Sequence, residues 1–208
     1  MKYKLKEIYY TLQGEGTYTG HAAVFARFTG CNLWSGREVD RHKAICQFCD
    51  TDFVGTDGEL GGKYTAKELV ETIRSLWPSD DECFVVFTGG EPGLQLDEAL
   101  VKELHDQRCF IAIETNGTVE LPAGIDWVCV SPKANSDVIL KSGNELKLVY
   151  PQPGMMPEDC KEWEFDQFYL QPMDCEEVED YTKQAIKYIR SHPQWKLSIQ
   201  THKILGIL

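Results

Sequence analysis

The chain has 208 residues, of which 42% are hydrophobic and 26% charged, and its net charge is −12. This composition is typical of a globular domain, and disorder is not expected. Because phosphate neutralisation requires an excess of Lys and Arg, the acidic balance argues against a general nucleic-acid-binding protein. No apolar run reaches the roughly 18 residues of a membrane span, and the basic start at 1–6 lacks the apolar stretch of a signal peptide. We therefore expect one domain over residues 1–208, in the cytoplasm and without a membrane partner.

An apolar run from residue 8 leads into Gln13-Gly14-Glu15-Gly16, where glycines flank one acidic side chain. Such glycines permit unusual backbone angles and close approach of a ligand, although an isolated segment of this kind is more often a turn. The next strand is predicted over 22–28 and ends directly before Thr29 and Gly30. Its alternation assigns Val24, Ala26 and Phe28 to one face and Ala23, Phe25 and Arg27 to the other. The Arg27 side chain then either is solvated at the edge of the sheet or binds a substrate carboxylate through its planar guanidinium group.

Cys31, Cys46 and Cys49 are separated by intervals of fourteen and two residues, so three thiolates can meet at one inorganic centre. A structural zinc site usually takes four protein ligands, whereas an iron-sulfur cluster held by three thiolates leaves one iron open. A Cys3His zinc knuckle that includes His42 is the alternative, and the cysteines alone do not decide between the two. Within the cluster loop 31–51, the inserted segment 32–45 predicts a short helix or an ordered loop over the cluster.

The remaining cysteines are expected to be reduced, because disulfides are rare in a cytosolic setting. Cys83, Cys109 and Cys129 lie in or beside apolar strand segments and are predicted to belong to the core. Cys160 and Cys175 flank a proline- and acid-rich stretch, and no role is assigned to them.

Helices are predicted over 65–77, 96–107 and 177–191, and the first of them begins with Thr65 and Glu68 at the spacing of a capping box. Buried strands are predicted at 84–87, within 110–117 and 127–133, and at 145–149, 166–174 and 197–200. Polar segments stand at the carboxyl ends of these strands, the edge where ligands collect in α/β proteins. They are Thr88-Gly89-Gly90-Glu91-Pro92, Glu114-Thr115-Asn116-Gly117, Ser131-Pro132-Lys133 and Gln171-Pro172-Met173-Asp174. An eight-strand barrel needs about 250 residues, so the sequence predicts an α/β fold of the incomplete (βα)6-type partial TIM barrel kind. Its open edge needs cover from loops or a second subunit, and we expect a homodimer.

In this order, the segments resemble those of the radical S-adenosylmethionine (SAM) enzymes, and most closely the 7-carboxy-7-deazaguanine synthases. Cys46-Gln47-Phe48-Cys49 fits the second half of the usual C-x3-C-x-aromatic-C pattern, while the expanded first interval departs from it. The resemblance implies a 4Fe-4S cluster on the three cysteines and SAM as cofactor. The SAM contacts that it implies are Phe48, Asp50, Gly90, Glu91, Glu114, Ser131, Lys133, Gln171, Pro172, Met173 and Asp174, with Glu91 as an acceptor for the methionine amine. The substrate contacts that it implies are Leu12, Gln13, Gly14, Glu15, Arg27 and Thr88.

The same resemblance implies a radical SAM lyase that converts 6-carboxy-5,6,7,8-tetrahydropterin to 7-carboxy-7-deazaguanine with loss of ammonia, on the path to queuosine-type nucleosides. Thr51 is the family position for a Mg²⁺ ligand, although a lone hydroxyl is a poor site and the turn after Asp50 is an alternative role for it. A flavodoxin or ferredoxin would supply the electron. His202 is either a surface residue or close to the substrate. A glycyl-radical activating enzyme and a zinc-stabilised binding module are the alternative functions.

Overall fold

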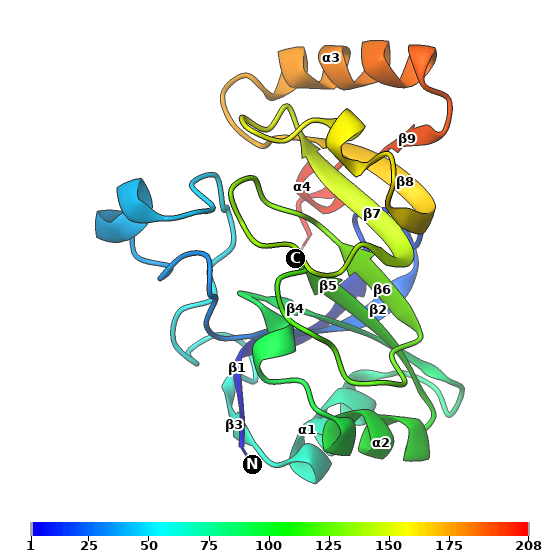
Figure 1. The fold of residues 1–208 in the computed structure, drawn as a ribbon. Helices are drawn as coiled ribbons and strands as arrows, with labels where there is room; N and C mark the ends of the chain where they lie inside the picture. The colour runs from blue at the N-terminus through cyan, green and yellow to red at the C-terminus, as the bar shows by residue number, and fades with distance from the viewer. Residues whose placement is uncertain (1, 208) are drawn as a thin grey trace.

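The computed structural model describes residues 2–207, which form one curved sheet with the longer helices on its outer face (Figure 1). The strands are β1 (Tyr3–Leu12), β2 (Ala22–Phe28), β3 (Gly62–Tyr64), β4 (Cys83–Gly89), β5 (Cys109–Thr115), β6 (Trp127–Val130), β7 (Ser142–Tyr150), β8 (Glu164–Pro172) and β9 (Trp195–Leu197). The helices are α1 (Ala66–Leu76), α2 (Glu98–Asp106), α3 (Val178–Ser191) and α4 (Thr201–Leu205), with short 3-10 helices η1 (Glu38–Lys43), η2 (Pro92–Leu94) and η3 (Pro157–Cys160).

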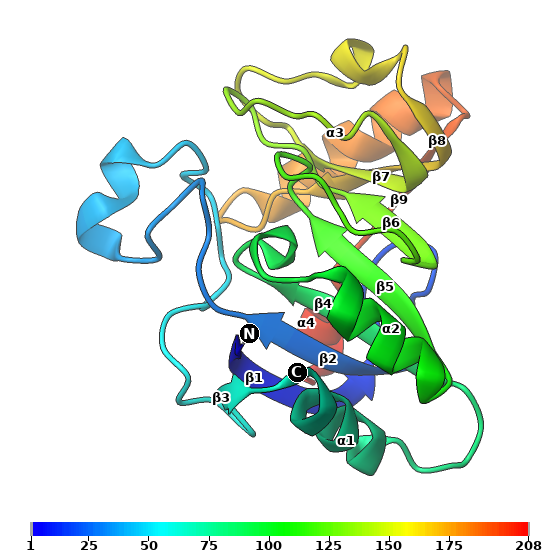
Figure 2. The same cartoon turned by 60° about the horizontal axis from the view of Figure 1, so that its bottom comes forward.

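The sheet has the order β3-β1-β2-β4-β5-β6-β7-β8-β9 and is parallel from β2 to β9. Strands β1 and β3 are antiparallel additions at one edge. The parallel part is the predicted incomplete barrel of α/β class. Because the sheet curves without closing, β3 and β9 remain as edges, and the concave face is accessible from one side (Figures 1 and 2).

The two faces of the parallel strands follow the predicted alternation. Val24, Ala26 and Phe28 are fully buried on the outer face, where α1 and α2 cover the first half of the sheet. A second core forms under α3, where Leu146, Leu148 and Leu170 pack. The opposite, inner face carries polar side chains of β2, β5 and β7, so the barrel interior is where chemistry is expected.

The predicted helices are confirmed with small shifts at their ends. Thr65 and Glu68 form the predicted capping box of α1. Helix α2 begins at Glu98 rather than residue 96, because the Asp97 side chain accepts a hydrogen bond from the Leu100 amide and caps the helix there. The inserted segment contains η1, which projects from the body of the molecule in both ribbon views (Figures 1 and 2).

The final strand prediction was misplaced. Strand β9 covers 195–197 rather than 197–200, and the short helix α4 follows it. The chain leaves the sheet at Ser198, and the Thr201 amide donates to the carbonyl of Gly14 near the first edge of the sheet. No helix within residues 2–207 is both long enough and apolar enough to span a membrane.

Candidate active site

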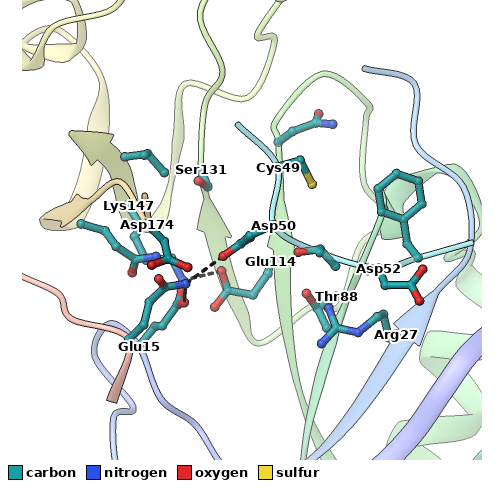
Figure 3. Close-up of a pocket in the computed structure, with 18 of the residues that line it drawn as sticks. Glu15, Arg27, Cys49, Asp50, Asp52, Thr88, Glu114, Ser131, Lys147 and Asp174 are labelled. Atoms are coloured by element: carbon teal, nitrogen blue, oxygen red, sulfur yellow. Dashed lines mark hydrogen bonds and ion pairs between the residues drawn. The ribbon is translucent and has the colours of Figure 1, made fainter. Parts of the chain in front are cut away.

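A cavity of about 410 Å³ lies on the inner face of the sheet, around the carboxyl ends of the parallel strands (Figure 3). The three cysteines of the cluster loop line it together with Thr51. The predicted SAM contacts that line it are Phe48, Asp50, Gly90, Glu114, Ser131, Lys133, Gln171, Pro172, Met173 and Asp174. All six predicted substrate contacts also line it: Leu12, Gln13, Gly14, Glu15, Arg27 and Thr88. Segments far apart in the sequence thus meet at one place.

Glu91 is the exception among the predicted contacts. Its side chain has no exposed surface and lies outside the cavity lining. Its two oxygens accept hydrogen bonds from the Thr115 hydroxyl and the Asn116 amide, both at 2.7 Å, and from the Gly93 amide at 2.9 Å. Burial raises the pKa of this carboxyl against the effect of these donors. The expected direct contact with a methionine amine is therefore not what the geometry offers, and Glu91 instead joins the end of β4 to the end of β5.

Gly90 is required by a close approach of two segments. A side chain at this position would lie 1.9 Å from the carbonyl oxygen of Gly30, directly before the first cysteine. The neighbouring Glu91 amide donates to the same carbonyl at 2.8 Å. The glycine pair therefore allows the end of β4 to hold the start of the cluster loop.

The three thiols line one cavity, and two of them are in contact. The Cys46 thiol donates a hydrogen bond to Cys49, which lowers the pKa of Cys49 to about 6 against the effect of burial and raises the pKa of Cys46. Arg41 of η1 donates to the carbonyls of Gln47 and Cys49, at 2.9 and 3.0 Å, and its guanidinium lies 4.0 Å from the centre of the Trp34 ring. The insertion thus contains a short helix, one of the two predicted forms, and Arg41 fastens it to residues 47–49.

Three cysteine thiols on one cavity are the kind of donors that an iron-sulfur cluster takes. Within residues 2–207, no three His, Cys, Asp or Glu side chains are close enough together to hold one metal ion. A 4Fe-4S cluster does not need its thiolates so close together, because each thiolate binds a different iron. His42, the fourth ligand of the alternative zinc knuckle, is exposed on η1 and does not line the cavity.

The other cysteines lie away from this loop. Cys83, Cys109 and Cys129 are buried in the sheet, as predicted. Cys160 is buried under α3, and Cys175 is partly exposed.

Arg27 lies on the inner face of β2 and is not a solvated edge residue. Its Nε donates to Glu7 at 2.8 Å and one terminal nitrogen donates to the Tyr9 hydroxyl at 3.0 Å, both on the adjacent strand β1. Burial lowers the pKa of Arg27, but Tyr9 and Glu7 outweigh this effect and raise it. The guanidinium is therefore a charged group of fixed orientation at the cavity wall.

The segment after Cys49 is fixed by a residue that sequence reasoning missed. The Lys6 ammonium lies 2.8 Å from Asp52 and 2.7 Å from Asp57, and donates to the Val54 carbonyl at 3.0 Å. Lys6 is 8% exposed, so its three protons are used within the protein. These contacts hold the chain directly after Thr51 against β1.

The glycine-bracketed segment reaches the cavity from the opposite end of the barrel. Because β1 is antiparallel to β2, residues 13–16 follow β1 at the amino-terminal ends of the parallel strands. Gly14 is needed there because a side chain at this position would lie 2.2 Å from Nδ1 of His202. Residues 13–16 therefore lie at the end of the sheet opposite to the four polar segments that follow the parallel strands.

Lys147 is the second residue that sequence reasoning missed. Its ammonium lies on the inner face of β7, 2.6 Å from Glu15 and 2.7 Å from Glu114. Alternation was the signal available: the strand reads Glu145-Leu146-Lys147-Leu148-Val149, and its leucines occupy the outer face.

The last helix also contributes to the cavity wall. Gln200, His202 and Lys203 line it, and the Gln200 amide donates to Glu15 at 3.0 Å. The question left open for His202 is thereby answered in favour of the cavity. Burial lowers the pKa of this histidine, because its charged form is poorly solvated there.

Comparison with known proteins now decides the family. Residues 41–147 match the radical SAM superfamily. Over its whole length the chain is 58% identical to 7-carboxy-7-deazaguanine synthases of Bradyrhizobium diazoefficiens and of Caulobacter vibrioides, each covered completely. The chain belongs to the 7-carboxy-7-deazaguanine synthase family.

More distant comparisons agree with this assignment. A 7-carboxy-7-deazaguanine synthase of Nitratidesulfovibrio vulgaris is 51% identical over all of both chains. The crystal structure of QueE from Escherichia coli has a TM-score of 0.70 and 26% identity, covering 96% of this chain and 94% of that chain. As a member of this family, the chain is a radical SAM lyase that uses a 4Fe-4S cluster and SAM and acts on a small molecule.

Proposed function

We propose that the enzyme converts 6-carboxy-5,6,7,8-tetrahydropterin to 7-carboxy-7-deazaguanine, with loss of ammonia. The observation that carries this proposal is the single cavity in which the three cysteines and all six expected substrate contacts meet. When bound, the cluster and SAM supply a 5′-deoxyadenosyl radical that abstracts hydrogen from the substrate. The protein's own contribution is to bind, orient and exclude water.

In this proposal Cys31, Cys46 and Cys49 hold the cluster through their thiolates. SAM would lie against the polar segments that end the parallel strands, among them Ser131, Lys133 and the segment 171–174. Glu91 takes part indirectly, since it fixes the loop that contains Gly90. The backbone of Gly90 rather than the carboxylate of Glu91 would then face the methionine amine.

The substrate carboxylate would lie between Arg27 and Thr51. Arg27 offers a fixed cation, and the Thr51 hydroxyl would be one ligand of a Mg²⁺ ion completed by the carboxylate and water. Since Mg²⁺ prefers six oxygens, we expect it to bind well only with substrate present. We reassign Glu114 from the SAM contacts to the substrate contacts, because it lies 3.4 Å from Gln13 on another part of the same cavity wall, where the pterin ring would extend.

We also propose a reduced flavodoxin or ferredoxin as electron donor, a cytoplasmic enzyme and a homodimer. A thiolate-bound cluster favours a reducing compartment. The open edges of the sheet at β3 and β9 and the exposed Ile204 and Leu205 of α4 favour self-association.

The test is turnover by anaerobically reconstituted enzyme with SAM, reductant and the pterin, followed by mass spectrometry of the product. We expect 7-carboxy-7-deazaguanine to form, SAM cleavage to depend on the pterin, and both to increase when Mg²⁺ is added. SAM cleavage at the same rate with and without the pterin, with the pterin left unchanged, would overturn the proposal. That result would favour an activating enzyme that acts on a protein.

A further inference from the structure

A group of buried charges occupies the inner barrel wall beside the proposed pterin position. The carboxylates of Glu15 and Glu114 contact one ammonium, that of Lys147, and the Glu145 carboxylate lies beside them (Figure 3 shows all but Glu145). Lys147 is 3% exposed and Glu145 is 2% exposed. Three carboxyl groups with one cation leave an excess of negative charge in a poorly solvated place.

The sheet register places these residues together. Glu114 on β5 is paired with Cys129 on β6, which is paired with Glu145 on β7. Lys147 follows Glu145 by two residues on the same face, and Glu15 enters from the loop after β1.

Aromatic side chains pack beside this group of charges. Tyr18 lies 4.9 Å from both Phe84 and Trp127, measured between ring centres. The small cavity between these rings and the carboxylates has a volume of about 10 Å³. Such a volume holds one water molecule at most, so bulk water does not screen the charges from this side.

The carboxylate oxygens of Glu15 and Glu114 have different hydrogen-bond partners. Glu15 receives Lys147 on one oxygen, at 2.6 Å, and the Gln200 amide on the other, at 3.0 Å. Glu114 accepts a hydrogen bond from Lys147 on Oε2 at 2.7 Å and a long one of 3.4 Å from Gln13 on Oε1, and the buried Cys129 thiol lies beside the same carboxylate. Glu114 therefore retains an oxygen that can accept a hydrogen bond from a ligand in the cavity.

The ionisation of the group follows from the same contacts. Burial alone would raise the pKa of Glu15, but Lys147 and Gln200 outweigh it and lower this pKa to about 2. Burial raises the pKa of Glu114, and the neighbouring carboxylates Glu15 and Glu145 add to this effect against Lys147. Burial opposes the charge on Lys147, yet Glu114 and Glu15 raise its pKa well above the ordinary value. Lys147 is thus a permanent cation.

We propose that Lys147 is a positioning residue that holds Glu114 with one oxygen directed at the N–H edge of the substrate's pyrimidine ring and so sets the orientation of the pterin. The inference rests on the proposed function. Arg27 lies on a different part of the cavity wall and suits a carboxylate, while the acidic group around Lys147 suits N–H donors and repels a carboxylate. The charges of the cavity therefore favour one direction of the substrate.

The test compares Lys147→Met with Lys161→Met, a matched change at a side chain that is 73% exposed. Without the ammonium, Glu15 and Glu114 face each other uncompensated, and one of them must bind a proton. We expect KM for the pterin to rise at least about tenfold and the pH profile of kcat/KM to gain an ionisation. The affinity for SAM should stay within about twofold of wild type, because its proposed contacts lie elsewhere on the wall.

The double variant Glu15→Gln with Lys147→Met separates positioning from mere structure. It removes one of the two repelling carboxylates, so we expect it to recover a lower KM than Lys147→Met and to lose the added ionisation. If Lys147→Met does not fold, the double variant is compared directly with Glu15→Gln, and a KM raised at least about tenfold is again expected.

Two failures are distinguishable. Absence of product from the wild type overturns the proposed function. Product from the wild type together with an unchanged KM and pH profile in Lys147→Met overturns the role of Lys147. Equal losses in kcat, pterin KM and SAM affinity, without recovery in the double variant, would also overturn it and assign Lys147 to the fold alone.

Discussion

The Lys203 ammonium lies 2.6 Å from the Asp50 carboxylate, which ties the last helix to the residue after the third cysteine. The same ammonium forms an ion pair with Asp174 at the end of β8. Burial opposes its charge, but hydrogen bonds to Asp174 and Asp50 outweigh this and raise the pKa of Lys203. Helix α4 therefore connects two segments that we assign to SAM, across the open side of the barrel.

Lys203→Met should weaken SAM binding. Without the ammonium, Asp50 and Asp174 lose their common partner and their fixed positions at the cavity wall. Because hydrogen bonds to charged groups contribute about 1.5–3 kcal/mol, we expect the Kd for SAM to rise about tenfold. Equilibrium dialysis with the reconstituted enzyme measures this, and Lys183→Met, at an exposed ion pair of α3, is the control. Equal SAM affinity in both variants would show that α4 is not needed to shape the site.

Glu91→Gln should lower stability. The new amide group would face N–H or O–H donors where a carboxylate oxygen now accepts them from Thr115, Asn116 and Gly93. Leaving such a buried donor without a partner costs about 1–3 kcal/mol in the free energy of unfolding. Urea unfolding of the apoprotein gives the value. Glu162→Gln, at a side chain that is 84% exposed, should change stability by less than about 0.5 kcal/mol, and a similarly small change in Glu91→Gln would contradict the account.

Arg27→Lys should raise KM for the pterin while SAM cleavage without substrate stays unchanged. Lysine keeps the charge but loses the planar fork that Glu7 and Tyr9 hold in place. Steady-state kinetics should give a KM about tenfold higher, since charge-assisted paired hydrogen bonds are replaced by a point charge. Arg74→Lys, on α1 outside the cavity lining, serves as the matched change. A wild-type KM in Arg27→Lys would remove Arg27 from the substrate contacts.

Burial of His202 should make the free energy of unfolding depend on pH. Burial lowers its pKa in the folded protein below the ordinary value of 6.5, with Lys203 adding to the shift against Glu15 and Asp50. As the pH falls below about 6.5, the unfolded chain therefore binds the proton first, and the free energy of unfolding decreases. Above that pH this residue contributes no slope. The difference in urea midpoint between wild type and His202→Gln, followed from pH 8 to pH 5 in roughly half-unit steps, should vary below about pH 6.5 and stay constant above it. A constant difference throughout would refute the assignment.

The features that depend on neighbouring residues in the chain were predicted correctly from the sequence. The capping box at Thr65 and the alternation of β2 depend on neighbours in the chain, and both were confirmed. The three cysteines and the polar ends of the strands were also brought to one cavity, because parallel strands end at the same edge.

Other features depend on long-range contacts that no local pattern contains. Glu91 was predicted as a ligand contact, yet its partners Thr115 and Asn116 come from the next strand and use its oxygens within the protein. Lys147 stood in an apolar strand without an evident role, since its partner Glu15 is 132 residues away. The same holds for Lys203 and Asp50, which are 153 residues apart.

The most direct test of the central claim is the iron and sulfide content and visible spectrum of the protein reconstituted without oxygen. We predict a brown protein with about four irons and four sulfides per chain, bleached by dithionite. Replacement of Cys31, Cys46 or Cys49 by Ala should abolish this cluster, whereas Cys175→Ala should retain it. A colourless wild-type protein that holds one tightly bound zinc per chain would contradict the radical mechanism and the assignment of the cavity.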